Sequence, residues 1–299
     1  MKSGFVGIVG RPNVGKSTLL NAILGEKIAI TTEKPQTTRN AIRGIFTRYG
    51  QAPGEEDIQM VFIDTPGIHK PRNKLGEFMT DAAISTFGEV DAIIFIVDEA
   101  LSRGPGDKYI VELLREIDTP KILVINKIDR MGPEEFAKTY REYEELEMFD
   151  KILGTSALEG IHVEDVIEAA SGFMEEGLMY FPDDIVTEHP ARFIVSEIIR
   201  EKVLMYLEDE VPHGVAVEIE QYVEEDRLTR IGAVIYCEKK SHKGMIIGKG
   251  GRKLKGIGKS AREEIEALLG TKVFLETWVK VKENWRDSNI ALTNFGYRD

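Results

Sequence analysis

The chain has 299 residues, which is long for a single core and suits two domains of ordinary size. Its 42% hydrophobic and 30% charged residues are typical of a soluble globular protein and exclude a disordered chain. No stretch approaches the ~20 unbroken apolar residues of a membrane span, and the first residues lack signal-peptide architecture, so we expect a cytoplasmic protein. Cys237 is the single cysteine, which excludes an intrachain disulfide and a thiolate metal cluster.

The net charge of −12 is unevenly distributed along the chain. Residues 191–299 hold 19 Lys and Arg against 18 Asp and Glu, so nearly all the acidity belongs to the first part. Within the second part, residues 239–262 hold nine basic residues and no acidic one. This run predicts a local basic face that can bind an anion although the whole chain is acidic.

Over residues 1–172, short apolar runs alternate with amphipathic stretches, the pattern of an α/β domain with a mainly parallel sheet. The loop at 50–57 is too short for a crossover helix, so the second and third strands should form an antiparallel hairpin. Helices fill the other gaps. The six predicted strands cover residues 4–9, 41–49, 59–64, 92–98, 121–125 and 152–155.

A phosphate-binding motif follows the first predicted strand and precedes a helix over 17–24. It matches G-x-x-x-x-G-K-[ST], with Thr18 next in the helix, and a plain glycine turn is the alternative interpretation. Its backbone N–H groups should wrap the phosphates, Lys16 should contact the β- and γ-phosphates, and Ser17 should ligate Mg²⁺. The motif consists of Gly10, Arg11, Pro12, Asn13, Val14, Gly15, Lys16 and Ser17.

A second motif, Asp64-Thr65-Pro66-Gly67, follows the third strand at the edge where ligands of open α/β sheets bind. We expect Asp64 to reach Mg²⁺ through water and the Gly67 N–H to contact the γ-phosphate. Between the two motifs, the polar segment 31–40 suits a switch that offers a threonine to Mg²⁺. Thr37 and Thr38 both qualify, and spacing alone does not choose between them.

Phosphate loops bind ATP and GTP alike, so the base of the nucleotide must be read elsewhere. The candidate is Asn126-Lys127-Ile128-Asp129, which closes the fifth strand. Guanine presents an N1–H and an exocyclic amine that the Asp129 carboxylate can accept together, whereas adenine lacks both, so an ATP-using enzyme is the disfavoured class. Asn126 should touch the purine N7 side or brace the phosphate loop, and the stem of Lys127 should lie on the base plane. After the sixth strand come Ser156 and Ala157, and the Ala157 N–H is a candidate donor to guanine O6.

The periodicity lapses after Gly172, and the proline-punctuated segment 173–190 is typical of a linker. A second pattern then predicts a helix over 192–208, a strand over 215–220 and a strand over 233–238. A glycine-rich basic segment, a helix over 258–269 and a strand over 273–281 follow. The expected order is helix, strand, strand, helix, helix, strand, with the glycine-rich loop between the last two helices. This order indicates a smaller α+β domain.

A G-x-x-G sequence with a basic residue inside lies in this basic segment and resembles the fingerprint of KH domains. In that family the loop clamps about four nucleotides of single-stranded RNA backbone. A solvated charged face is the alternative. Trp278 has two interpretations as well, core packing or base stacking. The candidate RNA-binding residues are Ile247, Gly248, Lys249, Gly250, Gly251, Arg252, Lys253 and Lys255.

Together with the run Gln36-Thr37-Thr38-Arg39, these motifs resemble the Era family of bacterial GTPases over the whole chain. The resemblance implies a GTPase domain over 1–172, a linker over 173–190 and a type II KH domain with a C-terminal tail over 191–299. It also implies that Thr38 is the magnesium threonine and that Asn13 helps to hold K⁺, as in related potassium-stimulated GTPases. Lys16, Thr38 and Gly67 are then the catalytic residues.

By the same resemblance, the chain would use GTP and Mg²⁺, bind 16S rRNA and assist maturation of the 30S ribosomal subunit, with no DNA as partner. A secondary contact with the inner face of the cell membrane is implied too. A GTPase whose small domain binds only protein or membrane is the competing interpretation. Ile68 follows Gly67 where Ras-like enzymes place a glutamine that orients the attacking water, so we expect slow intrinsic hydrolysis.

Overall fold

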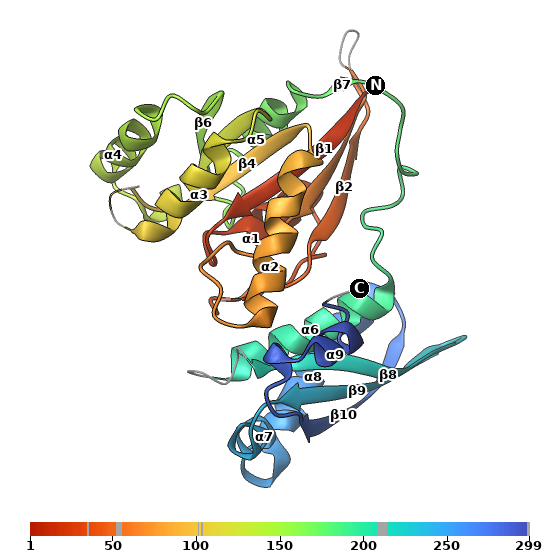
Figure 1. The fold of residues 1–299 in the computed structure, drawn as a ribbon. Helices are drawn as coiled ribbons and strands as arrows, with labels where there is room; N and C mark the ends of the chain where they lie inside the picture. Colours follow the sequence, from red (N-terminus) through yellow and green to blue (C-terminus); the bar gives the residue numbers. More distant parts are fainter. Residues whose placement is uncertain (35, 52–55, 101, 103, 208–213, 298–299) are drawn as a thin grey trace. The chain divides into compact units, whose positions relative to one another are not determined.

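A computed structural model of the chain describes residues 1–34, 36–51, 56–100, 102, 104–207 and 214–297. Part of the predicted hairpin loop, at 52–55, lies outside the described residues, as do the end of the predicted helix at 208 and the last two residues. The chain divides into two compact units (Figure 1). The first unit comprises Met1–Ala29, Thr38–Lys70 and Met79–Glu188, and the second comprises Ile30–Thr37, Pro71–Phe78 and His189–Asp299.

In the first unit, the described residues form a mixed sheet in the order β2-β3-β1-β4-β5-β6. The β1, β3, β4, β5 and β6 strands run parallel, and β2 pairs antiparallel with β3, so the predicted hairpin is confirmed. The β4 strand is buried at every position, as expected for an apolar run covered on both faces. The strands are β1 (Lys2–Gly10), β2 (Ile42–Arg48), β3 (Ile58–Asp64), β4 (Ala92–Val97), β5 (Lys121–Ile125) and β6 (Lys151–Gly154).

Helices connect the parallel strands, as the right-handed crossover of such sheets requires. The core beneath them consists of apolar residues from the sheet, among them Val6, Ile8, Ile94 and Val124, each with no exposed surface. The helices are α1 (Lys16–Leu24), α2 (Lys74–Ser85), α3 (Pro105–Arg115), α4 (Pro133–Glu144) and α5 (Val163–Ser171).

The segment predicted as a linker contains regular structure that its sequence pattern does not indicate. The two-residue strand β7 (Glu175–Glu176) pairs antiparallel with β1, so the described part of the sheet has a seventh, short strand beyond the predicted six. The side chain of Gln59 accepts the N–H groups of Tyr180 and Phe181 at 2.7 and 3.0 Å. Two residues carry no periodic signal, so only backbone pairing with β1 could identify β7.

The second unit builds a three-stranded sheet in the order β10-β9-β8, with β8 antiparallel and β10 parallel to β9. Apolar residues of α6, α8 and the sheet form its core, among them Val195, Ile199, Ile257 and Ile235. The element order is that of a type II KH domain, as predicted. The elements are α6 (Ala191–Tyr206), β8 (Ala216–Glu225), β9 (Leu228–Cys237), α7 (Lys240–Ile247), α8 (Arg252–Leu269) and β10 (Lys272–Val281).

Three predicted boundaries in this unit are wrong. The β8 and β9 strands run through polar residues to the turn at 226–227, because backbone pairing extends the hairpin beyond its apolar part. The α8 helix begins at Arg252, six residues before the predicted start at Gly258. Its glycines read as breakers in the sequence, but Gly256 lets α8 approach α6: a Cβ there would lie 3.0 Å from the Tyr206 ring.

The C-terminal tail folds onto the second unit. Trp285 is fully buried and donates its indole N–H to the Gly214 carbonyl at 2.9 Å. Its ring contacts those of Phe295 and Tyr297, which follow α9 (Asn289–Asn294). Of the two interpretations of Trp278, core packing is wrong, because the residue is 45% exposed. Among the described residues, no helix combines the length and apolar character that crossing a bilayer demands.

Candidate nucleotide site and nucleic-acid groove

The phosphate-loop motif lies between β1 and α1, as predicted. Lys16 is buried, and its ammonium donates to the carbonyls of Arg11 at 2.9 Å and Gly10 at 3.3 Å. A Cβ on Gly15 would lie 2.1 Å from the Asn126 side-chain nitrogen, so the loop wraps closely around its neighbours only with glycine there. The loop thus holds a cation and the N-terminus of α1 beside each other, which suits a polyphosphate.

Three oxygen-bearing side chains converge beside this loop. The Ser17 hydroxyl donates to Asp64 Oδ2 at 2.6 Å and lies 2.8 Å from the Thr38 hydroxyl. Thr38 also donates to Asp64 Oδ2, at 3.3 Å. Thr37, the alternative threonine, instead donates its hydroxyl to the Lys34 carbonyl at 2.6 Å. The geometry therefore favours Thr38.

These oxygens fit a magnesium ion. Hydroxyl and carboxylate oxygens are the ligands that Mg²⁺ prefers, and phosphates commonly complete its shell. The second carboxylate oxygen of Asp64 is buried and makes no hydrogen bond with the described residues, which leaves an acceptor for a water of such an ion.

Burial controls the protonation of the two charged groups at this point. It raises the pKa of Asp64 to about 6, although Lys16, Ser17 and Thr38 each oppose the rise. It lowers the pKa of Lys16 to about 8, against the pull of the Asp64 carboxylate. Each buried charge thus supports the ionised form of the other, and an anionic phosphate next to Lys16 would favour its charged form further.

The residues that follow Asp64, from Thr65 to Ile68, are buried. Thr65 is fully buried and donates both its N–H and its hydroxyl to the Ile8 carbonyl, so its side chain anchors the loop to β1. The Ile68 side chain is 1% exposed and packs in the core, and its N–H donates to the Gly10 carbonyl. Ile68 thus presents no side chain to a reacting water.

The base-reading residues meet at the ends of β5 and β6. Asn126 donates to the Val14 carbonyl at 2.8 Å and accepts the Ala157 N–H at 3.0 Å, which favours the bracing role over a contact with purine N7. The Ala157 N–H is engaged in that bond, so contact with guanine O6 requires the N–H to be shared. Ser156 donates its hydroxyl to Asp129 Oδ1 at 2.5 Å, which orients the carboxylate.

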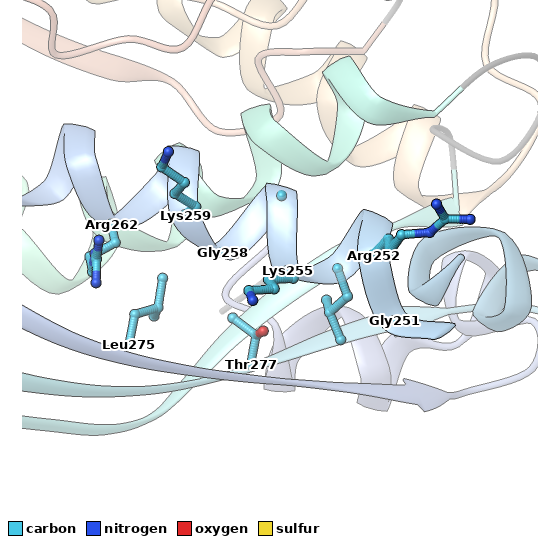
Figure 2. Close-up of a pocket in the computed structure, with 10 residues that line it drawn as sticks. Gly251, Arg252, Lys255, Gly258, Lys259, Arg262, Leu275 and Thr277 are labelled. Carbon is cyan, nitrogen blue, oxygen red and sulfur yellow. The ribbon is translucent and has the colours of Figure 1, made fainter. Parts of the chain in front are cut away.

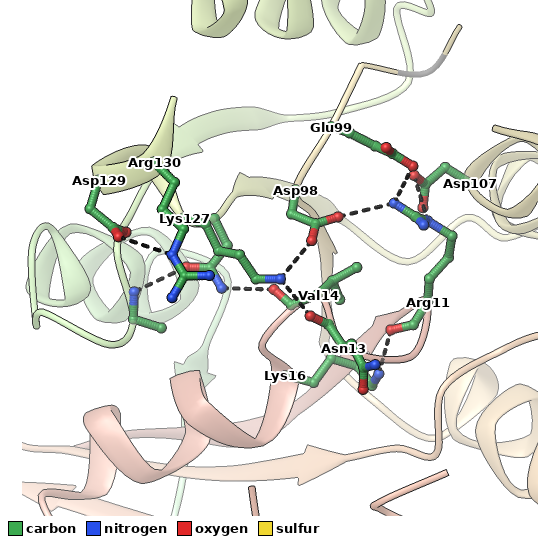
Figure 3. A network of polar contacts seen from close by, with 12 residues as sticks. Arg11, Asn13, Val14, Lys16, Asp98, Glu99, Asp107, Lys127, Asp129 and Arg130 are labelled. Atoms are coloured by element: carbon green, nitrogen blue, oxygen red, sulfur yellow. Dashed lines mark hydrogen bonds and ion pairs between the residues drawn. The ribbon is translucent and has the colours of Figure 1, made fainter. Parts of the chain in front are cut away.

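Three acidic residues outside the predicted site pair with Arg11, and one of them, Asp98, also pairs with Lys127. Figure 3 shows Asp98 between the side chains of Arg11 and Lys127, with Glu99 and Asp107 on the far side of Arg11. Asp98 follows β4 directly, so the rule that selected Asp64 and Asn126 at strand ends could have found it. Asp107 lies in the first turn of α3 and carried no such signal.

The second unit holds a groove of about 750 Å³ between α8 and β10. Figure 2 shows the basic side chains of α8 on one side of it and Leu275 and Thr277 of β10 on the other. At one end lies the predicted G-x-x-G turn, where Gly248, Gly250 and Gly251 all have positive φ. The basic residues that line the groove are Arg252, Lys255, Lys259 and Arg262, all exposed.

The spacing of these cations along α8 suits an extended anionic ligand. Steps of three, four and three residues place the four cations on one side of α8. The phosphate backbone of a single nucleic-acid strand can follow such a row. Lys259 and Arg262 were not among the predicted binding residues, although their helical spacing could have identified them. Trp278 alternates with Leu275 and Thr277 along β10 and therefore lies on the opposite face of the sheet.

The fold and site define a P-loop guanine-nucleotide-binding protein with a C-terminal KH domain. Residues 5–127 match the family described as 50S ribosome-binding GTPase, and residues 210–286 match the KH domain family. The chain is 57% identical to GTPase Era of Alkaliphilus oremlandii over 99% of both chains. It is 54% identical to GTPase Era of Clostridioides difficile, over 100% of this chain and 99% of the relative. The chain therefore belongs to the Era family of GTPases.

Two solved structures resemble the chain over its whole length and theirs. One is a single-substitution variant of Aquifex aeolicus Era bound to GDP and AlF4⁻, with a TM-score of 0.92 and 37% identity. The other is Era in complex with MgGDPNP and nucleotides 1506–1542 of 16S ribosomal RNA, with a TM-score of 0.92 and 38% identity.

Proposed function

We propose that this chain is a GTP-hydrolysing switch that binds 16S rRNA through its KH domain and assists maturation of the 30S subunit. The observation that carries the RNA part is the row of four cations on α8, which lines a groove ending at the G-x-x-G turn. The related complex with nucleotides 1506–1542 of 16S rRNA supports the choice of RNA. Hydrolysis would release the bound RNA or reset the complex.

In the nucleotide site, Ser17 and Thr38 would ligate Mg²⁺ directly and Asp64 would act through water. When bound, the ion neutralises charge on the phosphate oxygens. Lys16 contributes a buried cation beside the phosphates, and the Gly67 N–H would contact the γ-phosphate. The remaining nucleotide contacts come from the phosphate loop, Thr18, the segment 64–68 and the base-reading residues Asn126, Lys127, Asp129, Ser156 and Ala157.

Hydrolysis should be slow and stimulated by K⁺. With Ile68 buried, the chain offers no carboxamide at that position to orient water, so a second cation near the phosphates would lower the barrier. Asn13 is the proposed K⁺ ligand in the phosphate loop. Turnover of the purified full chain with saturating GTP and Mg²⁺ should be faster in KCl than in NaCl at equal ionic strength. Equal rates in both salts would remove K⁺ from the mechanism.

Crosslinking tests the RNA partner. The full chain is crosslinked in cells in the presence of bound GTP, with a Lys16→Met variant as control, and the attached RNA is sequenced. Reads concentrated in 16S rRNA are expected. Reads concentrated in 23S rRNA would instead indicate binding to the large subunit. The description of the matching GTPase family names that subunit. No enrichment over the control would leave a domain that binds protein or membrane.

We further propose the boundaries 1–172 for the GTPase domain, 173–190 for the connection and 191–299 for the KH domain with its tail. A cytoplasmic location follows from the ribosomal partner. A peripheral contact with the inner face of the cell membrane is a secondary proposal, supported by the exposed cations of α8, which anionic lipid would also attract.

A further inference from the structure

A carboxylate at the end of β4 joins the two loops that form the nucleotide site. Asp98 Oδ1 accepts a hydrogen bond from the Arg11 guanidinium of the phosphate loop at 3.0 Å. Asp98 Oδ2 accepts one from the Lys127 ammonium of the base-reading loop at 2.7 Å. Lys127 also donates to the Asn13 carbonyl at 2.6 Å (Figure 3). Both oxygens of one carboxylate are therefore occupied by cations from different loops.

Arg11 is fixed on its other side by two more carboxylates. Its guanidinium lies 2.8 Å from Asp107 and 2.7 Å from Glu99, and the Asp107 side chain is only 3% exposed. A buried carboxylate of this kind needs a cation, and a planar guanidinium can serve several partners at fixed angles. Three carboxylates thus hold Arg11 in place, and its charge is compensated before any phosphate binds.

We propose that Asp98 is a positioning residue for Lys127, and that Arg11, held by Asp107 and Glu99, keeps Asp98 in place. Lys127 has a φ of 62°, a left-handed conformation that is unfavourable for lysine, so fixed partners for its side chain stabilise this loop shape. Two anchors at the ammonium set the path of the aliphatic stem, which is the part that meets the base. The site is therefore ordered for guanine before the nucleotide arrives, which reduces the entropy lost on binding.

Asp98→Asn is the informative substitution because both oxygens are in use. An asparagine has the same size but one acceptor, so its amide nitrogen would face either Arg11 or Lys127. Glu112→Gln is the matched control: it removes a carboxylate from α3, outside the proposed network, where Glu112 pairs with Arg115 and is 72% exposed on its side chain.

The test measures dissociation of a fluorescent GDP analogue from the full chain, together with kcat and KM for GTP. Losing one of the two charge-assisted hydrogen bonds breaks the link between Arg11 and Lys127, so GDP release from Asp98→Asn should be about tenfold faster. KM for GTP should rise, and kcat should fall by a smaller factor than KM rises, because Lys16, Ser17 and Thr38 are untouched. Glu112→Gln should match the wild type.

A double-mutant cycle separates positioning from folding. In a Lys127→Met background, Asp98→Asn should have little further effect on GDP release, because its partner is gone. An equal effect in both backgrounds would overturn the proposal and assign Asp98 a general structural role, as would wild-type release from Asp98→Asn. The inference rests on guanine-nucleotide binding at this site. A wild-type chain that failed to bind GDP would refute the proposed function itself. A wild-type chain that bound GDP, with a variant that released it at the same rate, would refute only the role of Asp98.

Discussion

Replacing Asp129 with asparagine is expected to reverse the base preference of the chain from guanine to xanthine nucleotides. The Asp129 carboxylate would accept the two adjacent donors of guanine, whereas xanthine replaces the exocyclic amine with a carbonyl that needs a donor. Asparagine supplies that donor through its amide nitrogen. Its oxygen can still accept the Ser156 hydroxyl, which lies 2.5 Å from Asp129 Oδ1, so the side chain keeps its orientation.

The expected magnitude is large because the mismatch sets a donor against a donor, or an acceptor against an acceptor, and leaves both groups unpaired. The ratio of affinities for GDP and XDP should change by about 10⁴ in favour of XDP. Equilibrium titration of both nucleotides with the full chain, at equal Mg²⁺, measures it. Asp118→Asn is the control, an exposed carboxylate in the loop before β5. A variant that kept the wild-type ratio would show that Asp129 does not read the base.

The second prediction places one negative charge in the G-x-x-G turn. Gly250→Asp should weaken RNA binding by about tenfold or more, because its carboxylate would stand where a phosphate is expected. Gly250 has φ of 61° and ψ of 27°, and a Cβ there meets no atom within 4 Å. Aspartate and asparagine both tolerate this left-handed conformation, so the backbone can accept either residue.

Gly250→Asn is the matched control, with the same shape and backbone cost but no charge. Binding of an RNA with the sequence of nucleotides 1506–1542 of 16S rRNA is titrated over a range of salt, using the full chain with a non-hydrolysable GTP analogue. The aspartate variant should lose affinity and about one unit of salt slope, and the asparagine variant should lose much less. If both variants lost the same affinity, the effect would come from the backbone of the turn and not from the charge. If both variants bound the RNA as tightly as the wild type, the turn would not belong to the interface.

The sequence predicted most of the nucleotide site because its parts are local. Each motif is a short run at the end of a strand, and the strand order of an open α/β sheet brings such ends together. Ser17 and Asp64 are 47 residues apart, yet both were expected at the same ion, and their side chains lie 2.6 Å apart. The spacing could not choose between Thr37 and Thr38, because both are polar residues of one irregular segment.

The missed features depend on contacts between distant elements. Asp107 is an ordinary acidic residue in the first turn of a helix until the fold places it 2.8 Å from Arg11. The start of α8 was misplaced because Gly256 disfavours a helix locally, whereas its close packing against Tyr206 favours one. The two-residue strand β7 exists only through its pairing with β1.

By itself, therefore, the sequence determined the fold class, the guanine nucleotide and the basic G-x-x-G turn, because short-range patterns and strand ends carry that information. Only the tertiary structure placed Thr38 beside Ser17 and Asp64, aligned four cations of α8 along one groove, and joined Arg11 to Lys127 through Asp98. Those arrangements depend on which side chains meet across elements. The physical reason is that burial and charge pairing act through space, so their effect appears only when the chain is folded.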